Sequence, residues 1–275
     1  MAGRLAGKVA IITGATSGIG EATARRFVEE GAQVVIAGRT QDKGEALAKE
    51  LGANAIFQRA DVLQEADIAA LIDAAKNRFG RLDCLFNNAG ASTPCKLDTV
   101  TAEQFSANMQ LLIGSVVFGI KHAIRVMKPQ GGGSIINNAS VAGHRYAQGD
   151  IMYSTAKAAV AHLTRLAGVE LGPLGIRVNA ISPGAVATPI FWGGSARANT
   201  LSDAENQKKL AKLEANLAKA TPLPRTGYPV DIANAALFLA SDEGSFVNCH
   251  DLVVDGGRIW QFYERPASSN SPSPA

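Results

Sequence analysis

Two residues with the chemistry of proton transfer, Tyr153 and Lys157, stand four positions apart in the stretch YSTAK. The stretch opens a segment of helical periodicity, and residues four apart lie on one face of a helix. The Lys157 ammonium would therefore lie near the Tyr153 phenol and lower the phenol pKa from about 10, which suits general acid/base chemistry near neutral pH. The spacing also arises by chance, and a solvated surface pair is the alternative.

A hydroxyl that could act with this pair is Ser140, thirteen residues before Tyr153 at the end of the apolar stretch SIINNAS. If that stretch is a strand, its carboxyl end faces the start of a neighbouring helix, and both hydroxyls could bind one carbonyl or alcohol oxygen. We expect Ser140 to polarise and orient that oxygen. A nucleophilic serine would require a GxSxG turn and a partnered histidine, whereas His144 merely follows nearby.

The stretch TGATSGIG places three glycines where the apolar run at 9–12 leads into a segment of helical pattern. Gly14 permits a tight turn, Gly18 allows a pyrophosphate to approach the backbone, and Gly20 allows the helix to pack against the sheet. The motif predicts a dinucleotide site, although its spacing differs from GxGxxG and a purely structural turn is the alternative. The residues that we assign to this site are Gly14, Thr16, Ser17, Gly18, Ile19 and Gly20.

The second apolar run ends in VVIAGRT, which bears on the choice of cofactor. A dinucleotide fold often has an acid at the position of Gly38, where it binds the adenosine ribose and would repel a 2′-phosphate. Gly38 followed by Arg39 leaves space and offers a guanidinium group to that phosphate. We therefore expect NADP(H) to be favoured, with NAD(H) possible. The alternative is that Arg39 is a solvated surface residue.

The elements that must position these residues alternate between short apolar runs and helix-period segments. Such alternation predicts strand–helix–strand crossovers and a parallel sheet with helices on both faces. The predicted fold class is α/β, a single-domain doubly wound parallel sheet of about seven strands. The predicted strands are KVAIIT, QVVIAG, AIFQRA, LDCLFN, SIINNAS, IRVNAIS and DLVVDGG, and the predicted helices span 21–30, 42–51, 66–79, 102–127, 153–171 and 230–240.

Two segments interrupt this order. Residues 188–221 form an insertion after a predicted strand, and because ligands bind at the carboxyl ends of strands in open α/β sheets, we expect a substrate lid. Residues 264–275, ERPASSNSPSPA, have the Pro and Ser content of a flexible tail. The dinucleotide-binding and catalytic domain therefore spans residues 1–263.

Composition narrows the class of protein. A chain of 275 residues with 47% hydrophobic residues can bury one substantial core. Its formal charge is +3, and its basic residues are scattered along the sequence without the dense cluster that would bind nucleic acid. Three irregularly spaced cysteines predict neither a disulfide framework nor a metal site. The N-terminus lacks a signal-peptide core, and no apolar run approaches the about 18 residues of a membrane span. We therefore expect a cytoplasmic protein without a membrane partner.

Together the motifs resemble those of the short-chain dehydrogenases/reductases, which reduce ketones or oxidise secondary alcohols. The resemblance covers about residues 5–260. It rests on TGATSGIG, Asp61-Val62, Asn87-Asn88-Ala89-Gly90, Ser140, Tyr153 with Lys157, and NAISPG at 179–184. It implies a Rossmann-type fold, a nicotinamide cofactor and a catalytic set of Ser140, Tyr153 and Lys157. A homotetramer, formed as a dimer of dimers through helices 102–127 and 153–171, is the usual family outcome.

The resemblance also implies cofactor contacts. Asp61 would accept a hydrogen bond from the adenine amino group with Val62 against the ring, although Asp61 as the N-cap of a helix beginning near Gln64 is the alternative. Asn88 is implied either to contact the cofactor or to act as an internal polar bracket. The other implied contacts are Ala89, Gly90, Tyr153, Lys157, Pro183, Gly184, Val186 and Thr188.

One position departs from the family pattern. The helix after NNAG usually carries an Asn that holds a water in the proton path from the lysine to solvent, and here that place falls at Leu111 or Leu112. Asn108 lies about one turn too early. We expect either a local bulge that brings Asn108 or Gln110 into use, or a path through other water and backbone groups.

The candidate walls of a substrate pocket are the loop at 144–152 and the lid residues at 190–192, which together suggest a cyclic or aromatic ketone or alcohol. The candidate contacts are Ser140, His144, Tyr146, Ile190, Phe191 and Trp192. Phe191 and Trp192 could equally pack the lid onto the domain. One alternative is a 3-oxoacyl thioester reductase, whose carrier could meet the basic residues Lys208, Lys209 and Lys212. The other is a dinucleotide-binding sensor or scaffold without turnover.

Overall fold

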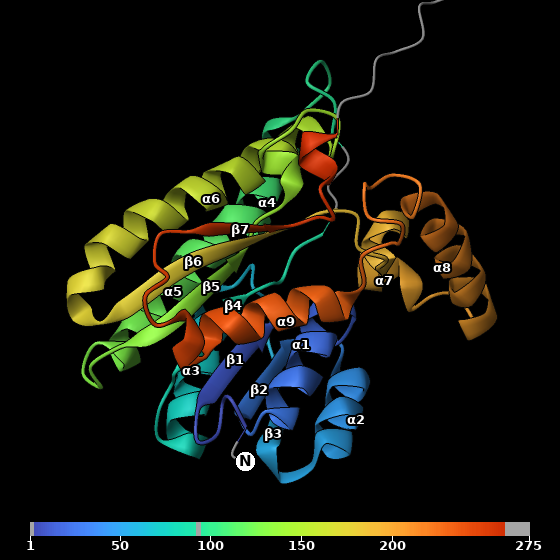
Figure 1. Cartoon of the computed structure of the whole chain (residues 1–275). Helices are drawn as coiled ribbons and strands as arrows, with labels where there is room; N and C mark the ends of the chain where they lie inside the picture. The colour runs from blue at the N-terminus through green and yellow to red at the C-terminus, as the bar shows by residue number, and fades with distance from the viewer. Residues whose placement is uncertain (1–2, 92–94, 262–275) are drawn as a thin grey trace, which may run out of the picture.

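A parallel sheet of seven strands forms the centre of the molecule (Figure 1). The computed structural model describes residues 3–91 and 95–261, and the tail predicted at 264–275 lies outside them. The strands are β1 (Val9–Thr13), β2 (Gln33–Gly38), β3 (Ala55–Arg59), β4 (Cys84–Asn87), β5 (Gly133–Asn138), β6 (Ile176–Pro183) and β7 (Asp251–Val254). Their order across the sheet is β3-β2-β1-β4-β5-β6-β7, and the predicted α/β doubly wound fold is confirmed.

Helices cover both faces of the sheet because successive strand side chains point into two different cores. Ile11 and Ile135 belong to one core, and Ile12 and Ile136 belong to the other. The first core is covered by α3 (Glu65–Phe79), α5 (Ser115–Met127) and α6 (Ile151–Leu171), and the second by α1 (Gly18–Glu29), α2 (Gln41–Leu51) and α9 (Pro229–Ala240). Burial on both faces explains why these strands are continuous apolar runs.

The segment predicted as one helix at 102–127 is interrupted in the structure. It consists of α4 (Ala102–Met109), a π-helical turn η2 (Gln110–Gly114) and α5. By length and composition this helix could cross a membrane, which the sequence had not suggested. In the structure, however, Val116, Ile120 and Ala123 are buried in the first core. The segment is therefore a core helix of the domain.

The order of the strands places a crevice at the carboxyl ends of the central strands. The chain runs from β1 outward to β2 and β3, then crosses to β4 on the other side of β1. At this reversal the connections from two neighbouring strands lead to opposite sides. In such sheets ligands bind in the crevice that this leaves at the carboxyl ends of those strands. Here that point lies between the glycine turn after Thr13 and the NNAG stretch that begins at Asn87.

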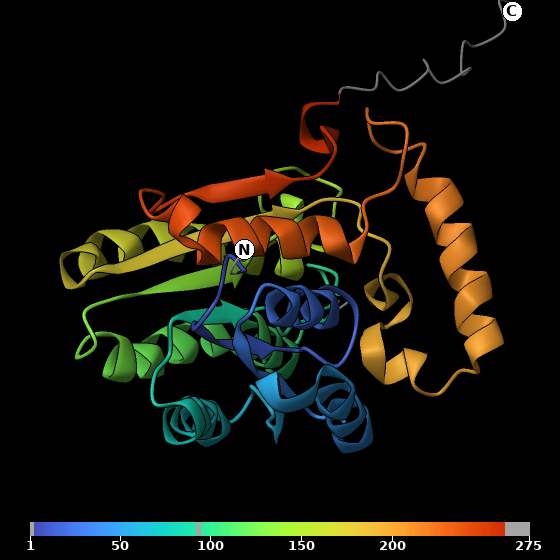
Figure 2. The same ribbon diagram turned by 60° about the horizontal axis from the view of Figure 1, so that its bottom comes forward.

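The inserted segment at 188–221 lies near the carboxyl ends of the strands. It contains η5 (Pro189–Trp192), α7 (Gly194–Ala198) and α8 (Asp203–Leu217), and Figures 1 and 2 show α7 and α8 set apart from the layers that cover the sheet. A small core of its own joins Leu217 to Ala185 and Ala187. The remaining short helices are η1 (Gly52–Asn54), η3 (Val141–Gly143), η4 (Gly172–Leu174), η6 (Asp242–Gly244) and η7 (Arg258–Trp260).

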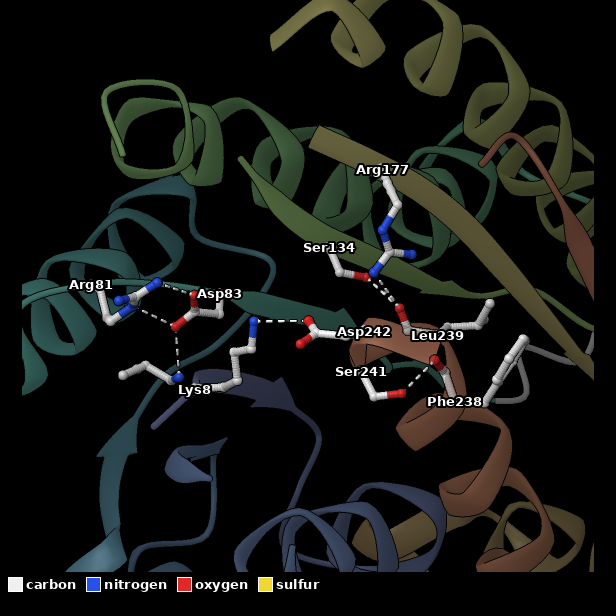
Figure 3. Close-up of polar contacts among 10 residues, drawn as sticks. Lys8, Arg81, Asp83, Ser134, Arg177, Phe238, Leu239, Ser241 and Asp242 are labelled. Carbon is white, nitrogen blue, oxygen red and sulfur yellow. Dashed lines mark hydrogen bonds and ion pairs between the residues drawn. The ribbon is translucent and has the colours of Figure 1, made fainter. Parts of the chain in front are cut away.

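Polar contacts hold the amino ends of the strands, at the end of the sheet opposite the crevice (Figure 3). The Leu239 carbonyl at the end of α9 accepts hydrogen bonds from Ser134 Oγ at 2.9 Å and from Arg177 Nη2 at 2.8 Å. The Asp83 carboxylate accepts from the backbone N–H of Val9 at 2.9 Å. These bonds satisfy a carbonyl at the end of a helix and an amide at the start of a strand. The polar residues at this end of the sheet therefore have a structural role.

Candidate active site

The glycine turn begins the site. Gly18 has φ +57°, in the region that favours glycine, and a Cβ built there would meet only Thr188 at 3.5 Å or more. A Cβ at Gly20 would lie 2.4 Å from the Gly14 carbonyl oxygen, so the helix can approach the turn this closely only with glycine. The start of α1 is therefore open toward the crevice.

Asn88 holds the ends of β1 and β4 together. Its Nδ2 donates to the Thr13 carbonyl at 2.8 Å and to the Gly14 carbonyl at 3.4 Å. The backbone N–H groups of Asn88 and Ala89 donate to the Thr13 hydroxyl at 2.9 and 3.0 Å. The internal bracket, one of the two roles left open by the sequence, is therefore present, and Asn88 also borders the crevice.

A cavity of about 550 Å³, which we call the glycine-turn cavity, runs along this crevice. The residues assigned to the cofactor from the sequence that line it are Gly14, Thr16, Ser17, Gly18, Ile19, Arg39, Asp61, Val62, Asn88, Ala89, Gly90 and Thr188. Gly20 does not line the cavity but lets α1 pack against the Gly14 carbonyl. Gly194, Ser195 and Ala196 of the inserted segment close one side of this cavity.

The end of β2 shows why Gly38 carries no side chain. A Cβ there would lie 2.7 Å from Thr16 Cγ2, so an acid at this position would clash with the glycine turn. Arg39 beside it is exposed and makes no hydrogen bond or ion pair with the residues that the structure describes. A free guanidinium group thus borders the cavity.

Asp61 lies at the same end of the cavity and does not cap the following helix. Its Oδ1 accepts from the backbone N–H of Leu63 at 3.1 Å, and its own N–H donates to Asp67 Oδ2 at 2.8 Å. The N-cap of α3 is Gln64. The alternative of an N-cap role for Asp61 is therefore wrong, and its carboxylate shapes the turn that borders the cavity.

Ser140 and Tyr153 face a second cavity of about 320 Å³, which we call the tyrosine cavity. Ser140 is the N-cap of η3, and its Oγ accepts from the backbone N–H of Ala142 at 3.1 Å. Tyr153 lies in the first turn of α6, whose N-cap Asp150 accepts from the Tyr153 N–H at 3.0 Å. The end of β5 and the start of α6 thereby bring these two side chains to the wall of one cavity.

Burial sets the charges of the pair. It raises the pKa of Tyr153 above its ordinary value, while the hydrogen bond with Ser140 opposes that rise. Burial also lowers the pKa of Lys157 to about 8. Lys157 Nζ donates to the Asn138 carbonyl at 2.5 Å and lies 5.5 Å from the centroid of the Tyr153 ring. The expected lowering of the phenol pKa by Lys157 is thus not seen; desolvation dominates both groups.

The π-helical turn η2 shows what occupies the place of the family's relay residue. Leu111 lines the glycine-turn cavity, and Leu112 is buried in contact with Gly90, beside Lys157. A Cβ on Gly90 would lie 3.5 Å from Leu112 Cδ2 and 3.9 Å from Lys157 Nζ. Gln110 lies against Gly114 of its own helix. The predicted bulge exists, but it sets an apolar side chain near the lysine.

Only part of the predicted substrate set lines the tyrosine cavity. Ser140, Ile190 and Phe191 line it, whereas Tyr146 is 89% exposed. Trp192 Nε1 donates to Asn206 Oδ1 of α8 at 3.3 Å, a bond within the inserted segment that supports neither the substrate contact nor the packing of the lid onto the domain. His144 Nε2 lies 2.8 Å from Asp251 Oδ2 and 3.1 Å from Ser182 Oγ, which turns the ring toward β6 and β7.

The structure adds lining residues that the sequence analysis missed. Pro183, Gly184 and Val186, expected as cofactor contacts, line the tyrosine cavity, as do Gln148, Gly149 and Asp150 of the loop at 144–152 that was a candidate wall. Asn138, Val141 and Arg258 were not assigned to it. Arg258 comes from η7, where its Nε donates to Gln148 Oε1 at 2.5 Å and its Nη1 to the Ala220 carbonyl at 3.0 Å. No local pattern marks this residue, because its position depends on the return of the chain after β7.

Comparison with known proteins identifies the family. A family model described as enoyl-(acyl carrier protein) reductase matches residues 14–258. A solved short-chain type dehydrogenase/reductase from Mycobacterium ulcerans superposes with a TM-score of 0.81 and 33% identity, covering 94% of this chain and 91% of that one. The chain belongs to the short-chain dehydrogenases/reductases. As such it is an oxidoreductase, and the family implies a nicotinamide dinucleotide cofactor.

Other proteins similar to this short-chain dehydrogenase/reductase are each named after a particular compound. Momilactone A synthase of Oryza sativa subsp. japonica is 44% identical over 257 residues, 92% of this chain and 90% of that protein. A 2,5-dichloro-2,5-cyclohexadiene-1,4-diol dehydrogenase of Sphingobium indicum is 39% identical, covering 94% and 98%. The borneol dehydrogenase of Lavandula x intermedia is 40% identical, covering 92% and 91%.

The residues present fit such a cofactor. The backbone at Gly18 is open to a pyrophosphate, and Arg39 is available to an anion at the far end of the glycine-turn cavity. Near the catalytic end, Asn138 Oδ1 is buried and makes no hydrogen bond with the described part of the chain. An unpaired buried acceptor is costly, which fits a donor supplied by a bound molecule.

Proposed function

We propose that this chain is an NADP(H)-preferring oxidoreductase that interconverts a ketone and a secondary alcohol on a cyclic, largely apolar small molecule. The observation that carries the proposal is the placement of Ser140 and Tyr153 at the wall of one cavity of about 320 Å³, with buried Lys157 5.5 Å from the centroid of the Tyr153 ring. That cavity shares lining residues with the glycine-turn cavity. Substrate and dinucleotide could thus meet at one place.

In this mechanism the bound nicotinamide would supply or accept the hydride. Ser140 donates a hydrogen bond to the substrate oxygen, and Tyr153 gives its phenol proton to that oxygen in reduction or takes the alcohol proton in oxidation. Because the pKa of Lys157 is about 8, its side chain is mostly an ammonium at neutral pH and offers a positive charge 5.5 Å from the centroid of the Tyr153 ring, while burial keeps the phenol pKa raised. Val141, Ile190 and Phe191 give the substrate side of the cavity an apolar lining.

The proposal is tested first with Tyr153→Phe. Loss of the phenol hydroxyl should lower kcat by about 10²- to 10⁴-fold, the usual contribution of general acid/base catalysis. The dissociation constant for NADP⁺, measured by titration calorimetry, should change little. Tyr146→Phe is the matched control, because Tyr146 is 89% exposed and outside both cavities. Full turnover in Tyr153→Phe would end the proposal.

The NADP(H) preference is proposed from the end of β2. Gly38 cannot be replaced by an acid without displacing Thr16, and the unpaired Arg39 borders the cavity. Arg39→Ala should raise KM for NADP⁺ about tenfold or more and leave KM for NAD⁺ nearly unchanged, because only the former carries the 2′-phosphate. The ratio of kcat/KM values for the two cofactors is the measurement. A wild-type preference for NAD⁺ that survives the substitution would contradict the assignment.

A 3-oxoacyl thioester reductase is the second candidate. Lys208, Lys209 and Lys212 are exposed on α8, where an acidic carrier could reach them, and the matching family model is described by an acyl carrier reaction. A cyclic ketone and an acetoacetyl thioester, compared at equal concentration with NADPH, separate the two candidates. Faster turnover of the cyclic ketone supports the leading proposal.

We further propose that the inserted segment at 188–221 acts as a lid, that the protein is a cytoplasmic homotetramer, and that residues up to 263 form its one domain. The lid proposal is supported by Gly194, Ser195 and Ala196, which line the glycine-turn cavity. A reducing compartment is supported by the three cysteines, which are all free. The assembly is argued below from its exposed apolar residues.

A further inference from the structure

The two cavities meet at a small set of residues. Ile19, Asn138, Thr188 and Ile190 line both of them, and only Asn138 and Thr188 among these are polar. If the glycine turn binds the pyrophosphate and Tyr153 acts on the substrate, the nicotinamide nucleoside must lie at this junction. The polar groups of Asn138 are therefore near the reacting half of the cofactor, although no motif singled this residue out.

The orientation of the Asn138 side chain follows from its neighbours. Asn88 donates to two backbone carbonyls, so its Nδ2 must face them and its Oδ1 must face Asn138. The Asn138 group opposite that oxygen must then be its Nδ2, and this atom lies 2.9 Å from Asn88 Oδ1. The carboxamide of Asn138 cannot be flipped without placing two acceptors together. Its Oδ1 is the atom left over.

That leftover oxygen has no hydrogen-bond partner among the described residues. Asn138 Oδ1 is buried and makes no hydrogen bond with the described residues, while Lys157 Nζ is bonded to the main-chain carbonyl of the same residue. Asn88 uses the Nδ2 of Asn138, whereas the unpaired Oδ1 costs folding free energy that a ligand contact would repay.

We propose that Asn138 Oδ1 accepts a hydrogen bond from a hydroxyl of the nicotinamide ribose, an assignment that rests on the proposed function. Lys157 Nζ reaches the same residue through its main-chain carbonyl, at 2.5 Å. A hydroxyl matches this pair because it can accept from Lys157 while it donates to Asn138. A phosphate offers only acceptors, and the amino group of a carboxamide only donates.

The test compares fragments of the cofactor on the whole protein by titration calorimetry. The probes are 2′-phospho-ADP-ribose, which contains the second ribose, and 2′-phospho-ADP, which lacks it. In Asn138→Leu the affinity for the former should fall about tenfold, or about 1.4 kcal/mol. The affinity for the latter should stay within about twofold. Unchanged binding of 2′-phospho-ADP also shows that the variant has folded with its glycine turn intact.

Asn137→Ala is the matched control. Asn137 neighbours Asn138 but faces the other side of the sheet, where it binds Asn87 and Thr164, so the ratio of the two affinities should stay at the wild-type value. An equal ratio in Asn138→Leu and wild type would overturn the assignment while leaving the proposed function intact. If the wild-type protein binds neither fragment, the proposed function fails together with it.

Discussion

At the scale of single residues, burial works against the charges that catalysis needs. Desolvation raises the pKa of Tyr153 and lowers that of Lys157, so each side chain favours its uncharged form. Lys157 is only 4% exposed, and its ammonium donates to the uncharged main-chain carbonyl of Asn138. The phenolate and ammonium pair therefore forms only against a desolvation penalty.

This penalty predicts how stability depends on pH. Between pH 8 and pH 10, folded Lys157 has lost its proton while the unfolded chain, with a lysine pKa of 10.5, still binds it. The unfolded state then holds more protons, so the free energy of unfolding should rise with pH, by about 2 kcal/mol across this window. Above pH 10 the raised pKa of Tyr153 acts in the opposite direction.

Lys157→Met should remove that rise, because Met fills similar volume without a titrating group. Urea unfolding at pH 7, 8, 9 and 10 measures it, and Lys208→Met, at an exposed position of α8, should retain the wild-type slope. Parallel curves for Lys157→Met and wild type would show that Lys157 carries no such penalty. The window is set by the pKa of about 8 that burial gives to Lys157.

At the scale of elements, α5 is positioned by one close contact with the end of β4. A Cβ built on Gly119 would lie 2.2 Å from Asn87 Oδ1, and Asn87 Nδ2 in turn donates to Asn137 Oδ1 at 2.9 Å. Gly119 therefore lets the helix pack directly on the asparagine pair that joins β4 to β5. The same helix carries the π-helical turn that places Leu112 near Lys157.

Gly119→Ala should destabilise the fold by about 1–3 kcal/mol, the usual cost of overpacking a tight contact. Chemical denaturation monitored by circular dichroism gives the value. Gly172→Ala is the control, because a Cβ there would only make ordinary contact with Asn248 at 3.4 Å. Equal stability of the two variants would mean that α5 can shift away from β4 at no cost.

At the scale of the whole molecule, two exposed apolar groups support the proposed tetramer. Leu166 and Val169 are 57% and 71% exposed and lie three residues apart on α6, so they form one apolar patch. Val230, in the first turn of α9, and Phe246, beyond its carboxyl end, are exposed singly on the side that carries α9. A dimer of dimers requires two separate surfaces, of which the α6 patch fits one and the α9 side is left for the other.

Val169→Asp should therefore reduce the tetramer to a smaller species, since a carboxylate buried in an apolar contact is costly. Light scattering coupled to size exclusion measures the mass. Tyr146→Ser removes another exposed aromatic group outside these two surfaces and should leave the assembly unchanged. A monomeric wild-type protein at micromolar concentration would refute the tetramer.

The features that the sequence determined are local. The seven strands and their helices follow from apolar periodicity, and the open turn at Gly18 follows from a backbone conformation that favours glycine. The facing positions of Tyr153 and Lys157 follow from a spacing of one helical turn. The helix that carries them begins at Ile151, and its cap at Asp150 fixes where the pair stands.

Only the tertiary structure decided the rest, because it depends on which distant segments meet and on how much water they exclude. His144 turns to Asp251 on β7, and Arg258 reaches the tyrosine cavity from beyond β7, although neither contact has a local signal. The pKa of Lys157 is about 8 because the fold buries it. The unpaired oxygen of Asn138 exists because Asn88 faces two carbonyls of the glycine turn.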